Sequence, residues 1–235
     1  VVVVPIAEEQ TRVAALKAGE VDLVAALPYQ FVKDVRDTPG LQVIEQKGGL
    51  TASYMTVIMN TRERAMADVR VRKAIQLAIN KEAMHNAIWF GFGEVDCNLI
   101  PSNHWAYDPV TCPKRDVDAA KSLLKEAGYD SSNPLKIKYM PEPGAMFQKI
   151  AEVLKQNLPE ADVDMQVLVA ESPTWLDKVW FGVECSDGGH AGICKEYDLG
   201  DAWYTRTPDP DGLMQSVLRA KTDTSGWGGN NGMRY

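Results

Sequence analysis

The chain has 235 residues, of which 45% are hydrophobic and 24% charged, so it can bury the core of one large domain or of two smaller ones. The formal net charge of -7 argues against a general nucleic-acid binder, which normally presents a basic face. No apolar run reaches the roughly 18 residues that cross a bilayer, so the sequence predicts no membrane-spanning segment. The chain starts at Val1 without a charged leader, and we expect any secretion signal to have been removed or to lie outside this sequence.

The N-terminal part is predicted to alternate strands with one helix. Four apolar runs predict strands, at residues 1–6, 21–26, 41–45 and 54–60. Residues 8–18 predict a helix, because acids stand in its first turn, Lys17 in its last turn and Gly19 just beyond it. The opening of the chain is therefore expected to be βαβ-like.

Three helices with N-terminal caps are predicted in the middle of the chain. Asp68 precedes residues whose apolar side chains recur at the spacing of one helix face, and Asn80 caps a second helix. Asp116 caps a third helix, which ends at Gly128. Residues 93–115 form a long irregular segment between the second and third helices, and loops of this length are usually functional or stapled.

The last part of the chain again alternates strands and helices. The predicted elements are a strand at 135–139, a helix at 146–154, a strand at 163–169, a short helix opened by Ser172 and Pro173, and a strand at 197–204. The last strand runs into a turn over residues 205–212, which is stiff because proline fixes φ and lacks an amide donor. This alternation predicts an α/β fold. The glycine-rich end closes no element, and we expect the chain to be a fragment.

The four cysteines predict disulfide bonds. Cys97, Cys112, Cys185 and Cys194 lie in loop-like sequence and lack the CxxC spacing of a zinc or redox site. Three pairings are open, and the local one, Cys97 with Cys112 and Cys185 with Cys194, closes two short loops, each worth about 2–4 kcal/mol. Disulfides imply an oxidising compartment. The alternative is four reduced thiols in a cytosolic protein.

Five stretches of the sequence occur in the order typical of one protein family. They are residues 11–24, residues 68–75 continued by 78–82, residues 100–109, residues 118–129 and residues 208–212. Together they resemble the large extracytoplasmic solute-binding proteins of peptide, opine and nickel ABC importers, known as solute-binding protein family 5. The resemblance covers nearly the whole chain.

The resemblance implies a periplasmic-binding-protein-like fold of type II, a hinged clamp of two lobes that closes on its ligand. Residues 1–58 would form the end of lobe one and the approach to the hinge, and residues 59–235 most of the second lobe, incomplete at its C-terminus. It further implies a monomer outside the cytoplasm, in the periplasm or otherwise extracytoplasmic. That monomer would capture a small molecule or short peptide and deliver it to a membrane-embedded ABC permease.

Arg206 is the first candidate for a ligand contact. Peptide-binding members of the family commonly carry an acid at this position, which holds the α-amino group of the peptide. The planar guanidinium suits a carboxylate or phosphate, so the reversed charge favours a ligand with an anionic group. The alternative is an internal ion pair of Arg206 with Asp201, Asp209 or Asp211.

Trp203, Tyr204 and Trp175 are candidate walls of the same ligand pocket, since aromatic side chains offer a large contact area with a polar tip. Core packing is the alternative for each of them, and for Trp105. Residues 182–196 resemble an insertion relative to the short turn of the family, and we expect a disulfide-closed loop with a gating or contact role.

No catalytic residue, metal site or cofactor is predicted. An enzyme would need a nucleophile with its base, paired carboxylates or a metal cluster. His85, His104 and His190 stand apart without metal-ligand spacing, and Cys194, four positions after His190, is expected to be oxidised. Two alternatives to a binding protein stay open, a secreted or periplasmic hydrolase with an unrecognised site and a scaffold without ligand.

Overall fold

The computed structural model describes residues 1–25, 27–45, 53–61, 64–98, 100, 102, 104–180, 196–205 and 209–211. The chain divides into two compact units. Unit 1 comprises Val1–Lys47 and His85–Glu94, and unit 2 comprises Gly48–Met84 and Val95–Tyr235. The expected division at residues 58 and 59 concerns the lobes of a longer protein and stays a prediction.

The regular elements that the structure describes in unit 1 are all helical. Its elements are α1 (Glu9–Ala18), a 3-10 turn, η1 (Tyr29–Phe31), α2 (Val32–Arg36) and the end of α4 (Lys81–Trp89). The helix predicted over residues 8–18 is confirmed, and Gly19 ends it in the left-handed conformation at φ 72°. The guanidinium of Arg12 donates to the carbonyl oxygens of Ile6 and Ala7, at 2.9 and 2.8 Å, and so ties the entering chain to this helix.

The strands predicted at residues 1–6, 21–26 and 41–45 are wrong within the described residues, which are irregular there. A run of β-branched residues favours an extended chain, but a strand also needs a hydrogen-bonded neighbour. The described part of unit 1 contains no strand that could pair with these runs, and the side chains of the first four valines are exposed. The βαβ-like opening is therefore wrong as well.

Contacts between the helices hold unit 1 together. Lys17 of α1 pairs with Asp34 of α2 at 2.6 Å. The Tyr29 ring stacks on Phe92 with 5.8 Å between centroids, and the guanidinium of Arg36 lies 6.0 Å from the same Phe92 centroid. Residues 85–94 thus pack within unit 1, although they follow unit 2 residues in the chain.

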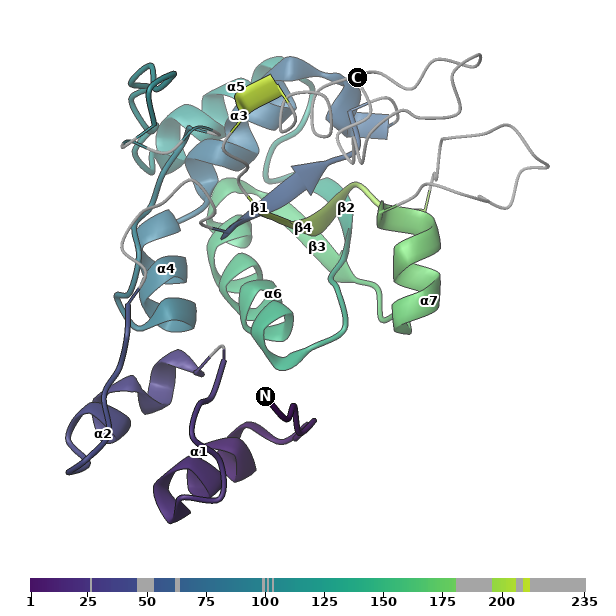
Figure 1. Cartoon of the computed structure of the whole chain (residues 1–235). Helices are drawn as coiled ribbons and strands as arrows, with labels where there is room; N and C mark the ends of the chain where they lie inside the picture. The colour runs from purple at the N-terminus through teal and green to yellow at the C-terminus, as the bar shows by residue number, and fades with distance from the viewer. Residues whose placement is uncertain are drawn as a thin grey trace. The chain divides into compact units, whose positions relative to one another are not determined.

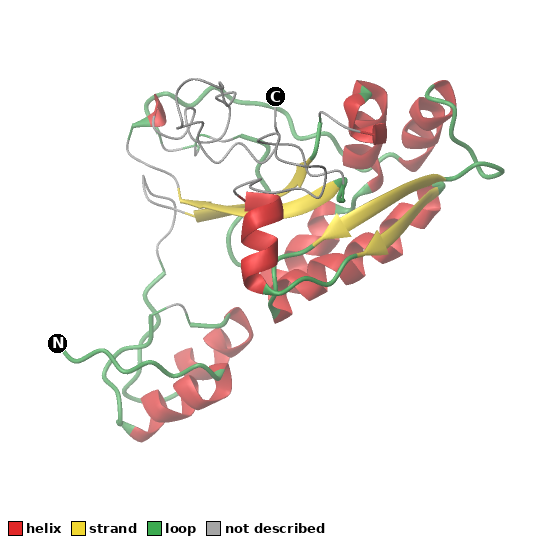
Figure 2. Ribbon diagram, turned by 90° about the vertical axis from the view of Figure 1, so that its right-hand side faces the viewer, coloured by secondary structure: helices red, strands yellow, loops and turns green. Residues whose placement is uncertain are grey.

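Unit 2 is built on a four-stranded mixed sheet with the order β1-β4-β2-β3. The strands are β1 (Ser53–Met59), β2 (Leu135–Met140), β3 (Val163–Val167) and β4 (Leu199–Thr205), and Figures 1 and 2 show them side by side. β4 pairs antiparallel with β1 and parallel with β2, and β2 pairs parallel with β3. The helix α6 (Ala145–Asn157) and the turn η3 (Leu158–Ala161) form the crossover from β2 to β3. The predicted α/β fold is confirmed in this unit.

The predicted helix caps of unit 2 are confirmed. Asp68 accepts from the amide of Arg70 at 2.8 Å at the start of α3 (Val69–Ala78), and Asn80 Oδ1 accepts from the amide of Ala83 at 2.9 Å in α4. Asp116 Oδ1 accepts from the amide of Ala119 at 2.9 Å at the start of α5 (Val117–Glu126). A short 3-10 turn, η2 (Arg64–Ala67), precedes α3.

An aromatic core cluster lies between the sheet and the helical turns that follow β3, α7 (Ser172–Trp175) and the π-helical turn η4 (Leu176–Trp180). Its buried members are Ile58, Met140, Trp175, Val179, Tyr197, Ala202 and Tyr204. Gly200 of β4 meets η4 here, since a Cβ atom built on it would lie 2.7 Å from Cγ1 of Val179. A glycine is therefore required for this close approach.

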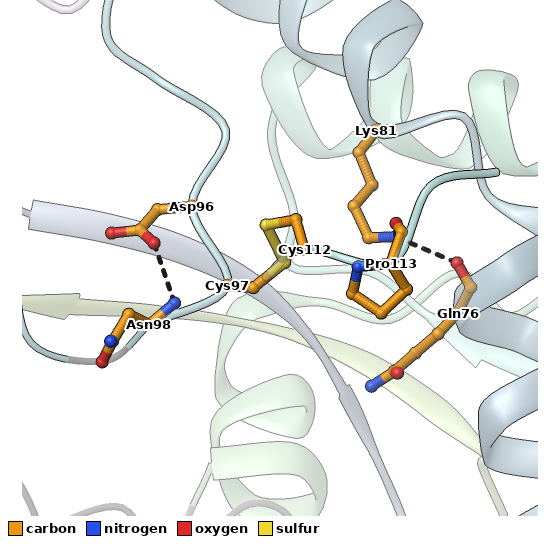
Figure 3. The surroundings of a disulfide bond; sticks show 7 residues. All are labelled: Gln76, Lys81, Asp96, Cys97, Asn98, Cys112 and Pro113. Atoms are coloured by element: carbon orange, nitrogen blue, oxygen red, sulfur yellow. Dashed lines mark hydrogen bonds between the residues drawn. A yellow bond between two sulfur atoms is a disulfide. The ribbon is translucent and has the colours of Figure 1, made fainter. Parts of the chain in front are cut away.

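The long irregular segment before α5 is stapled, as predicted, by a disulfide between Cys97 and Cys112, whose Cα atoms are 5.2 Å apart (Figure 3). Lys81 Nζ donates to the carbonyl oxygens of Gln76 and Pro113, at 3.0 and 3.1 Å, and so joins the segment to the end of α3. Burial lowers the pKa of Lys81. Cys185 and Cys194 lie outside the described residues.

Candidate functional site

The candidate site lies along β4, whose successive side chains point to opposite faces of the sheet. Trp203 faces Met55 across the β1–β4 pair, and 37% of its surface is exposed. Tyr204 faces Tyr54 in the same pair and is only 6% exposed. The two adjacent aromatic residues therefore lie on different faces, and of the two Trp203 is the one with accessible surface.

Tyr204 and Trp175 belong to one row of aromatic rings within the core cluster. The Tyr204 ring stacks on Tyr54 at 5.4 Å and contacts Trp180 at 5.5 Å, and Trp180 stacks on Trp175 at 6.1 Å. Trp175 is 3% exposed, and its Nε1 donates to the carbonyl oxygen of Met140 at 3.2 Å. Burial raises the pKa of Tyr204 to about 12, so its hydroxyl stays protonated at physiological pH.

Arg206 lies outside the described residues, and its role as a ligand contact stays a prediction. Of its three suggested internal partners, Asp209 Oδ1 accepts from the amide of Asp211 at 2.9 Å. Asp201 is completely buried and is bonded to β2 and to the turn that follows it. The roles of Trp203, Tyr204 and Trp175 as pocket walls also stay predictions.

Asp201 is a group that sequence reasoning considered only as a partner of Arg206. Its Oδ1 accepts a hydrogen bond from the hydroxyl of Tyr139, and its Oδ2 accepts from the amide of Glu142 at 2.8 Å. The two hydrogen bonds lower the pKa of the Asp201 carboxyl, but the loss of hydration on burial has the larger effect and raises this pKa to about 7. Burial likewise raises the pKa values of Tyr139 and Glu142.

One signal in the sequence could have identified this carboxyl. Asp201 interrupts an otherwise apolar run from Leu199 to Tyr204. In a strand it lies on the same face as the apolar Leu199, two positions earlier, and not on a face marked by polar side chains. A charged residue at a buried position of a strand needs partners. Its partner Tyr139 belongs to a strand some 60 positions earlier in the chain, a pairing that periodicity does not provide.

No group of three or more metal-ligating side chains gathers among the residues with described positions. His85 Nε2 is bonded to the carbonyl oxygen of Phe92 at 2.9 Å, and His104 Nδ1 accepts from the amide of Ala106 at 3.0 Å. His190 lies in the part that the structure does not describe. Within the described ranges, no helix combines the length and the apolar character needed to cross a membrane.

Residues 1–225 match the model of the family described as bacterial extracellular solute-binding proteins, family 5 Middle. The chain belongs to this family. The predicted resemblance is confirmed, and so is the location outside the cytoplasm that the cysteines indicated.

Relatives with known ligands accompany the family match. The dipeptide-binding protein of Escherichia coli K12 is 25% identical over 228 residues, which are 93% of this chain and 39% of that protein. Heme-binding protein A of Haemophilus influenzae is 35% identical over 120 residues, 51% of this chain and 21% of that protein. The chain thus spans about two fifths of the dipeptide-binding protein and a smaller share of the heme-binding protein.

Solved structures of periplasmic binding proteins share the fold. The ABC transporter-associated protein DppA of Helicobacter pylori, in complex with the peptide STSA, is 24% identical with a TM-score of 0.78, over 97% of this chain and 41% of that one. The agropinic acid complex of AgaA from A. tumefacien R10 is 22% identical with a TM-score of 0.73, over 97% of this chain and 43% of that one. At these identities the likeness shows the fold, which is that of the type II periplasmic binding proteins.

Proposed function

We propose that the protein carrying this chain is the substrate-binding component of an ABC importer. It captures a peptide-like or carboxylate-bearing solute outside the cytoplasmic membrane and hands it to a membrane-embedded permease. The observation that carries this proposal is the family match over residues 1–225, which covers almost the whole chain. The ligand-bound relatives with the same fold support it.

In this proposal residues 1–58 form the end of lobe one and the approach to the hinge, and residues 59–235 form most of the second lobe. The protein acts as a monomer, and it is a binder rather than an enzyme. A solute-binding site requires a concave surface with a few fixed polar anchors and no nucleophile or metal. The hydrogen-bonding partners of Asp201 fix the strand that leads to Arg206, which supports a preorganised anchor at its end.

Arg206 binds an anionic group of the ligand, and Trp203 provides a wall beside it. Trp203 is partly exposed on β4, whereas Tyr204 and Trp175 are buried and support the strand from the opposite face. A guanidinium that forks to a carboxylate would favour ligands with a free carboxyl group over ligands recognised through an amino group.

Ligand-induced stabilisation of the full-length protein tests the proposal. The protein is melted with dipeptides, opine-like amino-acid conjugates and other small anions, because a ligand at about 100 times its dissociation constant adds about 2.7 kcal/mol of stability. A shift with anionic compounds that Arg206→Asp abolishes, and that Arg206→Lys weakens, supports the assigned contact. A shift with ordinary peptides that is unchanged in Arg206→Asp makes Arg206 structural, and turnover of any compound would favour the hydrolase alternative.

A further inference from the structure

The turn between β2 and α6 contains very few groups that can hold it to the sheet. Its sequence is Pro141-Glu142-Pro143-Gly144, and proline has no amide hydrogen. The amide of Glu142 is therefore the one backbone donor in the first three positions, and it donates to Oδ2 of Asp201 at 2.8 Å. A single side chain of β4 thus accepts the hydrogen bond through which the start of this turn is attached.

The same carboxyl is bonded to the strand before the turn. The hydroxyl of Tyr139, near the end of β2, donates to Oδ1 of Asp201, and both residues are 0% exposed. We call Asp201, the Tyr139 hydroxyl and the Glu142 amide the Asp201 clamp. It joins β4 to both sides of the point where the chain leaves β2.

The charges around the clamp do not offset a negative carboxylate. In the part of the chain that the structure describes, the hydrogen-bond partners of Asp201 are the Tyr139 hydroxyl and the Glu142 amide, and no lysine, arginine or histidine forms an ion pair with it. The β1 residue opposite Asp201 is Val57, which is uncharged, and the Glu142 carboxylate, which is of like sign, raises the pKa of Asp201 further. On α6, Lys149 is half-buried and Glu152 and Lys155 are exposed, and none of them is bonded to Asp201.

A buried carboxylate without a cation is costly to ionise. The protonated acid stays in contact with both partners, because one oxygen accepts from the Glu142 amide and the other donates to the Tyr139 oxygen, whose own hydrogen then turns away from Asp201. We propose that the Asp201 clamp is a proton-controlled latch, which holds the β2–α6 turn closed while Asp201 is protonated and favours opening of the turn to water when Asp201 ionises. The inference concerns this chain alone and does not depend on which ligand the protein binds.

The sign of the effect follows from the pKa of Asp201, which burial raises to about 7 in the closed state from an ordinary value of 3.8. Because the closed state binds the proton more tightly, opening is suppressed most below about pH 4 and becomes easier as the pH rises toward 7. The opening equilibrium should rise about tenfold per pH unit in that window, to at most about 1,000-fold, and then level off.

Hydrogen exchange at single-amide resolution in the full-length protein tests the latch. After correction for intrinsic rates, protection of the Glu142 amide should fall with rising pH between about 4 and 7, by at least tenfold in total. The amide of Tyr129, which donates to the carbonyl oxygen of Leu124 at 2.9 Å, serves as internal control and should stay constant. Constant protection at Glu142, or an equal fall at Tyr129, would overturn the proposal.

Three variants separate the latch from other causes. Asp201→Asn mimics the protonated acid, and protection at Glu142 should become independent of pH. Glu142→Gln removes the like charge but keeps the amide, so the fall should level off at a lower pH and be smaller in total. Glu152→Gln removes an exposed carboxylate of α6 and should leave the profile unchanged. The proposal is refuted if Asp201→Asn retains the wild-type profile, and the wild-type and Glu142→Gln profiles decide it if Asp201→Asn does not fold.

Discussion

The hydroxyl of Tyr139 on β2 donates a hydrogen bond to Asp201 on β4, and no part of either side chain is exposed to water. The two strands share only a short stretch of parallel pairing, Tyr139 with Leu199 and Met140 with Gly200. The side-chain bond therefore adds a connection just beyond the point where the backbone ladder ends.

Tyr139→Phe should destabilise the protein by about 1–3 kcal/mol, since it leaves one oxygen of a buried carboxyl without its donor. The loss should be larger at pH 8 than at pH 5. The hydroxyl lowers the pKa of Asp201, so its removal raises that pKa further and makes the ionised form at high pH more costly. Urea unfolding at both pH values measures this, and an equal loss at both would contradict it. In an Asp201→Asn background the difference between the two pH values should vanish.

Gly200→Ala should cost about 1–3 kcal/mol through overpacking. The added methyl carbon would meet Cγ1 of Val179 at 2.7 Å, in a cluster where Val179 is 0% exposed. Val179→Ala removes that neighbour, so the double variant should be more stable than the sum of the two single losses indicates. Denaturation midpoints of the four proteins decide the matter, and strictly additive losses would mean that the two residues do not clash.

Replacing Cys97 and Cys112 by alanine should cost about 3 kcal/mol, because the disulfide closes a loop with a sequence separation of 15. Unfolding with and without reductant provides the comparison, since the wild type should lose at least as much when reduced. The double variant also tests the second predicted pair. If Cys185 and Cys194 form a disulfide, the variant should still respond to reductant, and a non-reducing peptide map should contain the linked peptides.

Asp116→Ala should cost about 1 kcal/mol, because the carboxylate accepts from the amide of Ala119 at 2.9 Å and satisfies a donor at the start of α5. Asp116→Asn is the matched control, since asparagine keeps an acceptor oxygen at the cap and should lose much less. Thermal unfolding of the two variants should therefore rank them clearly, and equal losses would show that the cap contributes through charge alone.

Local signals account for the elements that sequence analysis predicted correctly. Asp68, Asn80 and Asp116 cap helices because their short polar side chains reach backbone amides two or three residues ahead, an interaction within one segment of the chain. Strands that were predicted in unit 2 also have partners there. The failed strands of unit 1 had the same apolar character, and what they lacked was a neighbouring strand.

The candidate site was only partly accessible to sequence reasoning. Alternation along a strand is enough to separate Trp203 from Tyr204, but it does not show which face is covered. That depends on α7 and η4, which bring Trp175 and Val179 over the Tyr204 side. The Asp201 clamp joins residues from β2, a proline-rich turn and β4, so it exists only once the sheet has its final order.

The position of β4 inside the sheet also affects how the chain can fold. β4 is the last of the described strands, yet it lies between β1 and β2, and β1 has no other partner among these strands. Residues paired across β1 and β4, such as Ser53 and Thr205, are roughly 150 positions apart, and contacts of such long range slow folding. During synthesis β1 must wait as an unpaired edge until β4 has emerged about 150 residues later, so the sheet of unit 2 is completed late.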